Sequence, residues 1–250
     1  MIRTEHLTKS FGEVTAVSDL NLDIAQGELF AFLGPNGAGK TTTIKLLTGL
    51  LKPTSGRAIV AGHDIQRESV EARRLMSYVP DLAFLYDKLD PLEFMMFIGQ
   101  LYGMDRAEVS RVSNELFDLF DLDEARSRLI ETLSHGTRQR LVIAAALLHD
   151  PKVIIIDEPM VGLDPRSSRV VKNVLKERSR GGVTVFLSTH TLQVAEELAD
   201  RIGILSRGRL IAVGTMDELR QASGVGGALE DAFLMLTQEE EQEEVETRPA

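Results

Sequence analysis

The sequence predicts an α/β fold with a mainly parallel sheet flanked by helices. Three apolar runs are continuous rather than alternating: Leu29–Leu33, Val153–Asp157 and Val183–Ser188. Continuous runs are typical of parallel strands that are buried on both faces. A helical stretch, Arg166–Arg178, lies between the second and third runs and gives the strand–helix–strand rhythm of an open parallel sheet. Ligands bind at the ends of such strands, so candidate site residues are sought there.

The remaining segments add two smaller parts to this sheet. Short alternating segments between Ile2 and Ile24 predict an antiparallel β patch before the first buried strand. Thr41–Leu51 has helical spacing, and Arg57–Ala61 predicts another strand. The pattern from Pro91 to Leu148 is helical throughout, which predicts a helical subdomain, about 85–148, inserted into the α/β core. We expect one domain over 1–220, followed over 221–250 by a C-terminal helix and an acidic, disordered tail.

Composition limits the classes of protein that fit. The 250 residues are 43% hydrophobic, which suffices for a buried core, and there is no cysteine for a disulfide or a thiol metal site. No apolar run approaches the ~20 residues that cross a bilayer, and the N-terminus lacks the apolar core of a signal peptide. We therefore expect a cytosolic chain, or one held at a membrane only by a partner.

The charge is unevenly distributed along the chain. The net charge is −10, and Glu239–Ala250 has six acidic residues and one arginine, a net −5, so the remainder also carries −5. Nucleic-acid affinity depends on lysine and arginine that neutralise phosphates, so we expect no nucleic-acid partner.

A glycine-rich loop follows the first buried strand and has the composition of a phosphate-binding loop. Its glycines let backbone N–H groups turn inward around an anion. Lys40 can reach the β- and γ-phosphates, and Thr41 offers a hydroxyl to Mg²⁺. An ordinary glycine-rich turn is the alternative, but a strand before and a helix after favour the phosphate loop. The predicted nucleotide-binding residues here are Gly34, Pro35, Asn36, Gly37, Ala38, Gly39, Lys40, Thr41 and Thr42.

Three polar residues follow the other buried strands. Asp157 closes one strand and Glu158 comes next, so one carboxylate can hold Mg²⁺ and the other can orient or deprotonate an attacking water. His190 follows the next strand and would present its imidazole to the same crevice. A solvated acidic turn is the alternative for the two carboxylates, and a capping or core histidine is the alternative for His190.

A second candidate anion site precedes an apolar helix. Ser134 and Gly136 lie in the segment Leu133–Arg140, just before the run Leu141–Leu148. A helix N-terminus attracts anions, although by itself an ordinary N-cap is the better interpretation.

Together these segments resemble the nucleotide-binding subunits of ABC transporters over roughly Ile2 to Leu219. The resemblance identifies Gly34–Thr42 as the Walker A loop of a P-loop NTPase core and Val153–Glu158 as the Walker B strand. It identifies Leu133–Thr137 as the family signature and Val161–Asp164 as the D-loop. It implies ATP and Mg²⁺ as the ligands.

The resemblance also implies a role for each site residue. Glu158, His190 and Lys40 would be catalytic, with Glu158 activating water. Phe11 would stack on adenine, although a core phenylalanine is the alternative. The implied metal ligands are Thr41, Asp157 and Asp81. The implied nucleotide-binding residues outside the Walker A loop are Phe11, Ser134, Gly136 and Asp164.

In this family two subunits pair head to tail, so that Ser134 of one would close over ATP held by Lys40 of the other. The resemblance thus implies a second ATP-binding subunit, identical or related, and a separate membrane permease, with the chain on the cytoplasmic face of the membrane. It favours export.

Two positions depart from the family pattern. Asp81 stands where glutamine is usual, and it adds a charge beside the γ-phosphate. We hypothesise that Asp81 reaches the metal through water; a surface role is the alternative. His135 and Thr137 replace the more usual glycine and glutamine of the signature, and His135 either faces solvent or contacts phosphate.

Other functions fit less well. A soluble ABC ATPase acting on DNA or ribosomes would show tandem halves, a coiled-coil insertion or basic surfaces. A slow ATP-gated switch module is conceivable because two motifs are altered, but Asp157, Glu158 and His190 weigh against it. The apolar segment Phe94–Ile98 is mainly core, with Met95 or Met96 as candidates for a groove that receives a permease helix.

Overall fold

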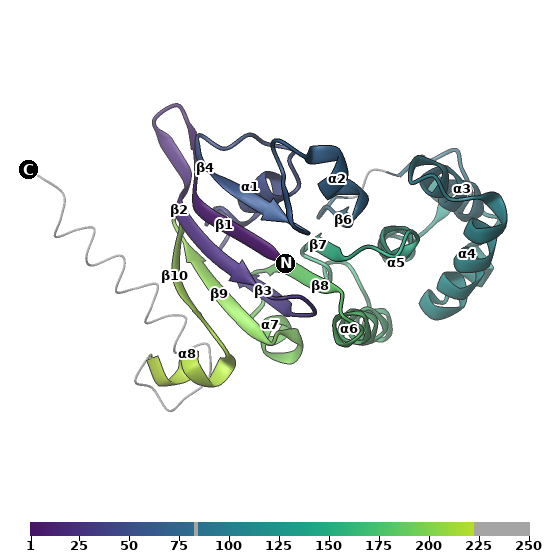
Figure 1. Ribbon diagram of the computed structural model, residues 1–250. Helices are drawn as coiled ribbons and strands as arrows, with labels where there is room; N and C mark the ends of the chain where they lie inside the picture. The colour runs from purple at the N-terminus through teal and green to yellow at the C-terminus, as the bar shows by residue number, and fades with distance from the viewer. Residues whose placement is uncertain (83–84, 223–250) are drawn as a thin grey trace, which may run out of the picture.

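The structure, a computed structural model, describes residues 1–82 and 85–222 and contains two sheets flanked by helices (Figure 1). The larger sheet has the strand order β10-β9-β3-β8-β7-β6, and all neighbours except β10 and β9 run parallel. The predicted parallel sheet is therefore confirmed. Its strands are β3 (Leu29–Leu33), β6 (Met76–Val79), β7 (Val153–Asp157), β8 (Thr184–Thr189), β9 (Arg201–Ser206) and β10 (Arg209–Gly214).

The smaller sheet is antiparallel and has the order β2-β1-β4-β5. It is the predicted N-terminal patch, extended by two strands from the segment after the first helix. In Figure 1 it lies at one side of the parallel sheet, beside β9 and β10. Its strands are β1 (Ile2–Phe11), β2 (Val14–Ile24), β4 (Ser55–Val60) and β5 (His63–Asp64).

Strand β3 shows why the apolar runs are continuous. All five of its residues are buried, and successive side chains point to opposite faces. Leu29, Ala31 and Leu33 join one hydrophobic core, whereas Phe30 and Phe32 join another. Both faces of the sheet therefore require apolar side chains, and the alternation of a half-exposed strand is absent.

The helices cover both faces of the parallel sheet. Several begin at side-chain caps: Asp90 forms a capping box with Glu93 at the start of α3, and Asp105 caps α4. The helices are α1 (Lys40–Leu47), α2 (Ser69–Arg74), α3 (Pro91–Leu101), α4 (Arg106–Phe120), α5 (His135–Leu147), α6 (Pro165–Arg180), α7 (Leu192–Leu198) and α8 (Met216–Ala222), with 3-10 turns at Asp123–Ala125 and Ile130–Thr132.

Helices α3 and α4 pack on each other at the edge of the molecule, away from the smaller sheet (Figure 1). Helix α5 lies between them and the parallel sheet and contacts α4, α6 and β6. Buried residues of α4 and α5 share one core with Ile154 and Leu187 of the sheet. A helical subdomain over 85–148 stays a prediction, as does the division at residue 220. The predicted acidic tail lies outside the described residues.

Candidate active site

A cavity of about 240 Å³ lies where β3 and β7 end and α1 begins. We call it the nucleotide pocket. Most residues predicted from the glycine-rich loop and the two carboxylates meet there, although they come from segments far apart in the chain. The pocket is lined by Ala16, Asn36, Gly37, Gly39, Lys40, Thr41, Thr42, Asp81, Asp157 and Glu158.

The loop backbone needs glycine where it approaches other segments. Gly39, the N-cap of α1, has a φ of 106°, and a Cβ there would lie 2.4 Å from the carbonyl oxygen of Ala16. A Cβ at Gly34 would lie 2.4 Å from the carbonyl oxygen of Leu205. No other residue fits at these two positions without moving neighbouring backbone, so the tight loop follows directly from the glycines.

Lys40 lies inside the loop that it follows. Its Nζ donates hydrogen bonds to the carbonyl oxygens of Gly34 at 2.6 Å and Pro35 at 3.0 Å. Burial lowers the pKa of Lys40, while the nearby charges of Glu158 and Asp157 act in the opposite direction. The ammonium group is thus held at the pocket wall with neutral carbonyl partners, which an anionic phosphate oxygen can replace.

Asp157 is almost fully buried and accepts hydrogen bonds from hydroxyl groups of two other elements. Thr41 Oγ1 of α1 donates to Oδ2 at 2.9 Å, and Ser188 Oγ of β8 donates to Oδ1. Ser188 is opposite Asp157 in the parallel register of β7 and β8. Sequence reasoning missed Ser188, because its only signal is its place at the end of the neighbouring strand.

Glu158 and His190 form a hydrogen-bonded pair beside the buried carboxylate. His190 Nδ1 lies 2.7 Å from Glu158 Oε1, and the two side chains are 49% and 14% exposed. Glu158 has a left-handed backbone with φ 51°, and its N–H donates to the carbonyl oxygen of Ser188 at 3.2 Å. A carboxylate oriented by an imidazole at the pocket edge has the arrangement of a general base.

The pocket offers oxygen ligands of the kind that Mg²⁺ prefers. Thr41 and Asp157 are already in contact, and Asp81 lines the same cavity with an exposed side chain. Within residues 1–82 and 85–222, no group of three or more acidic or histidine side chains could hold a metal alone. Mg²⁺ commonly takes one or two protein ligands and completes its shell with phosphates and water, so the residues present fit it.

Asp81 also influences its surroundings through its charge. The pKa of Tyr78 is raised to about 12, first by burial and then by the charges of Asp157 and Asp81. The segment that leads to Asp81 therefore lies within electrostatic reach of the buried carboxylate.

Gly34, Pro35 and Ala38 of the loop do not line the pocket, and neither do the four nucleotide-binding residues predicted outside the loop. Ser134 caps α5, where its hydroxyl accepts from the Thr137 N–H at 3.2 Å, and Asp164 caps α6. Gly136 is in the first turn of α5. Phe11 is 49% exposed, so the alternative of a core phenylalanine is wrong, and the Lys9 ammonium lies 5.0 Å from its ring centroid. These four residues therefore lie outside the pocket that Lys40, Asp157 and Glu158 line.

The comparisons with known proteins agree with this combination of fold and pocket. The family described as "ABC transporter" matches residues 17–161, more than half of the chain. The linearmycin resistance ATP-binding protein LnrL of Bacillus subtilis is 38% identical over 237 residues, which cover 95% of this chain and 75% of that protein.

Two solved structures extend the agreement to three dimensions. The ATP-binding subunit of an ABC transporter has a TM-score of 0.90 at 32% identity, covering 95% of this chain and 99% of that one. A dimeric ATP-binding cassette in a post-hydrolysis state with ADP and Pi has a TM-score of 0.78 at 27% identity, covering 86% and 98%. The chain belongs to the ABC transporter family. It is an ATP-binding subunit of the type that hydrolyses ATP to drive transport, and cassettes of this kind pair with a second ATPase subunit.

Proposed function

We propose that this chain hydrolyses ATP in the nucleotide pocket and couples the reaction to export through a separate membrane permease. The observation that carries the proposal is the grouping around one cavity of Lys40, the Thr41–Asp157 contact and Glu158, which is paired with His190. A structural acidic turn would not need a left-handed glutamate paired with a histidine from the next strand.

Each residue has a separate role in this proposal. Mg²⁺, when bound by Thr41 and Asp157 with Asp81 reaching it through water, supplies positive charge to the phosphates. Lys40 exchanges its carbonyl partners for the β- and γ-phosphates. Glu158 accepts a proton from the attacking water. His190 orients the Glu158 carboxylate through Nδ1 and places its other nitrogen toward the γ-phosphate.

A second ATPase subunit would supply the residues that the pocket lacks. Ser134 and Gly136 at the start of α5 would face ATP bound to the other subunit, and Asp164 would contact it from the adjacent loop. The N-terminal end of α5 carries a partial positive charge, which favours an anion there. Phe11 would stack on the adenine ring from the smaller sheet, since its side chain is exposed and free of the core.

We propose a membrane partner for two reasons, which are the name of the similar protein LnrL and an apolar groove on helix α3. LnrL is named for linearmycin resistance, which favours export as the direction. Among the helices of residues 1–82 and 85–222, none combines the length and apolarity that crossing a bilayer requires. We propose that the chain is peripheral on the cytoplasmic face of the membrane and that a permease forms the path.

We propose that the surface that binds the permease lies on α3. Met95 is fully buried, so its core interpretation is confirmed. Met96 instead lines a largely apolar groove of about 480 Å³ with Leu89, Leu92, Glu93, Phe97, Gln100 and Arg106. Met96 is therefore the methionine that a permease helix could contact.

The test is Glu158→Gln, which removes the base but keeps the size of the side chain. We expect ATP to bind, turnover to fall by at least about 100-fold, and a closed ATP-bound dimer to accumulate on gel filtration. Glu131→Gln changes a glutamate that pairs with Lys88 on the surface, and should behave as wild type. Fast turnover in Glu158→Gln would refute the assignment, and a wild-type chain that binds ATP without hydrolysis would favour the switch module.

A further inference from the structure

The histidine of the signature segment packs on the loop that follows Glu158. Gly162, within that loop, has a φ of 75°. A Cβ added to Gly162 would lie 2.1 Å from Cδ2 and 2.3 Å from Nε2 of His135. One edge of the imidazole ring therefore lies directly on the Gly162 α-carbon, although His135 is otherwise exposed. Only glycine leaves room for this contact.

A second contact joins the same two segments. A Cβ added to Gly136 would lie 3.4 Å from the carbonyl oxygen of Gly162, so the two backbones approach closely. His135 and Gly136 are the first two residues of α5, and Ser134 is its N-cap. A shift of Gly162 would therefore press on the turn that presents the Ser134 hydroxyl.

The loop that carries Gly162 is held at both ends. At its start, the Glu158 N–H donates to the Ser188 carbonyl, and the Val161 N–H donates to the Glu158 carbonyl at 3.3 Å. At its end, the Asp164 carboxylate accepts from the N–H groups of Arg166 at 2.9 Å and Ser167 at 3.0 Å. Because both ends are hydrogen-bonded, we expect a displacement of Gly162 to be passed on to Glu158 or α6.

We propose that His135 is a positioning residue that links the signature end of α5 to Glu158 within one subunit. The inference rests on the proposed function, in which Glu158 serves the ATP of its own subunit and Ser134 serves the ATP of the other. Closure of α5 over the neighbouring ATP then adjusts Glu158 through His135 and Gly162. The two ATP sites of a pair are coupled through this contact, and hydrolysis is cooperative in ATP.

The experiment compares His135→Gly, Gly162→Ala and the double variant in the full-length chain. Each is measured for steady-state ATP hydrolysis, giving kcat, KM and the Hill coefficient, for equilibrium binding of a fluorescent ATP analogue, and for thermal unfolding. His6→Gly is the matched control, because His6 is an exposed histidine on β1 with a φ of 49° that glycine accepts readily.

We expect His135→Gly to lower the Hill coefficient from above 1 toward 1 while analogue binding and the unfolding temperature stay unchanged. Gly162→Ala should reduce kcat by about fivefold or more, because its methyl group displaces the His135 ring. Adding Gly162→Ala to the His135→Gly chain should cost no more than about twofold, because the methyl group then meets no ring and only the backbone strain at φ 75° is left.

If Gly162→Ala lowered kcat by the same factor in the wild type and in His135→Gly, the proposal would be overturned, because the loss of kcat would then not depend on the His135 ring. An unchanged Hill coefficient in His135→Gly, or a wild-type coefficient of 1, would also overturn it. Failure of the proposed function appears elsewhere, as absent ATP turnover in the wild type or fast turnover in Glu158→Gln, and would overturn both.

Discussion

At the scale of single residues, two adjacent carboxylates line the same cavity because the backbone leaves the strand conformation between them. Successive residues of a strand point to opposite faces, so Asp157 and Glu158 would diverge if β7 continued. The left-handed φ of 51° at Glu158 turns the chain instead, and both side chains line the nucleotide pocket. Asp157 keeps the buried, hydroxyl-bound position, and Glu158 takes the position beside His190. The two acids thus acquire different environments, which suit the different roles proposed for them.

Asp81 departs from the family pattern, and a single substitution can test its proposed role at the metal. If Asp81 reaches Mg²⁺ through water, Asp81→Ala should raise the Mg²⁺ concentration for half-maximal ATPase activity by about tenfold, as loss of an outer-sphere carboxylate does. The measurement is ATP turnover against Mg²⁺ concentration, with and without the membrane partner.

Asp23→Ala is a suitable comparison for Asp81→Ala, because Asp23 is exposed on β2 and does not line the pocket. A Mg²⁺ dependence and a partner-stimulated turnover that match wild type in Asp81→Ala would contradict the metal role and leave Asp81 as a surface residue.

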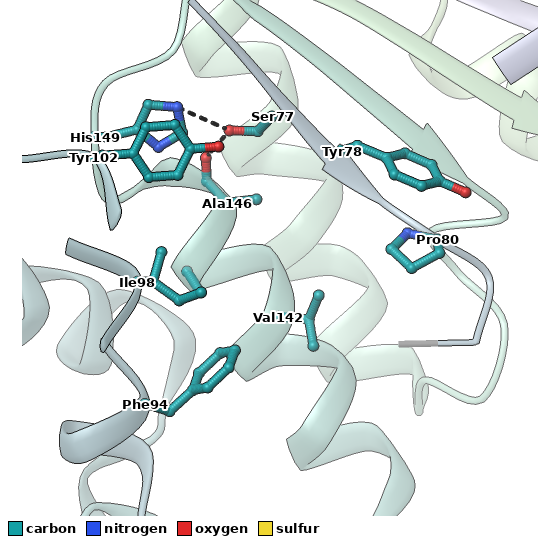
Figure 2. Close-up of a pocket in the computed structure, with 10 residues that line it drawn as sticks. Ser77, Tyr78, Pro80, Phe94, Ile98, Tyr102, Val142, Ala146 and His149 are labelled. Carbon is teal, nitrogen blue, oxygen red and sulfur yellow. Dashed lines mark hydrogen bonds between the residues drawn. The ribbon is translucent and has the colours of Figure 1, made fainter. Parts of the chain in front are cut away.

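At the scale of elements, the joint between the outer helices and the sheet contains an aromatic stack. Tyr102, the C-cap of α3, stacks on His149 after α5, with ring centroids 3.5 Å apart and an interplanar angle of 13°. Figure 2 shows both rings at one end of a cavity of about 250 Å³, with Ser77 of β6 beside them. Ser77 donates to the Ala146 carbonyl and lies 3.5 Å from His149 Nε2.

This joint makes the stability of the chain sensitive to acid. Burial lowers the pKa of His149 to about 4 from 6.5, so between these values the unfolded chain binds a proton that the folded chain does not. The stability contribution is complete above pH 6.5 and is lost as the pH falls through about 4. It is at most about 3 kcal/mol, reduced by the partial exposure of the ring.

His149→Phe keeps the stack and removes the proton site. We expect its free energy of unfolding, from urea titrations between pH 4 and 7.5, to fall less with acid than that of the wild type. Carboxylates titrate in both chains, so the difference between the two curves isolates His149. Parallel curves would show that protonation of His149 does not destabilise the fold.

At the scale of the whole molecule, the nucleotide pocket and the start of α5 are separate surfaces of one chain. Lys40 and Glu158 lie at the pocket, whereas Ser134 is absent from its lining. In the proposed function a single subunit would hold one half of each of two sites, which is consistent with the dimeric form of the related cassette. The rate of ATP hydrolysis should therefore depend more strongly on the pairing of two subunits than on any one surface residue.

The membrane partner is tested by Met96→Glu. A charge in the groove of α3 should abolish co-purification with the permease while nucleotide binding by the chain persists, because the groove and the nucleotide pocket have no lining residue in common. Pull-down from membranes and binding of a fluorescent ATP analogue are the two measurements.

Glu93→Gln, a milder change in the lining of the same groove, serves as the control. Retained permease binding in Met96→Glu would place the partner surface elsewhere on the chain. Unfolding of Met96→Glu would show that Met96 supports the core as Met95 does.

The sequence by itself determined the class of fold and most of the pocket. Continuous apolar runs predict buried parallel strands, and a glycine-rich loop between a strand and a helix predicts a phosphate cradle. Lys40, Thr41, Asp157 and Glu158 could be predicted because each has a fixed place next to such a strand or loop. These signals are local, and local geometry is encoded by residue type and spacing.

Only the tertiary structure decided which side chains meet across elements. The register of β7 and β8 places Ser188 against Asp157, and no spacing along the chain encodes that register. The burial of Met95 beside the half-buried Met96, and the contact of His135 with Gly162, depend likewise on how separate elements pack. Such contacts join residues distant in the chain, so they appear only when the whole core has assembled.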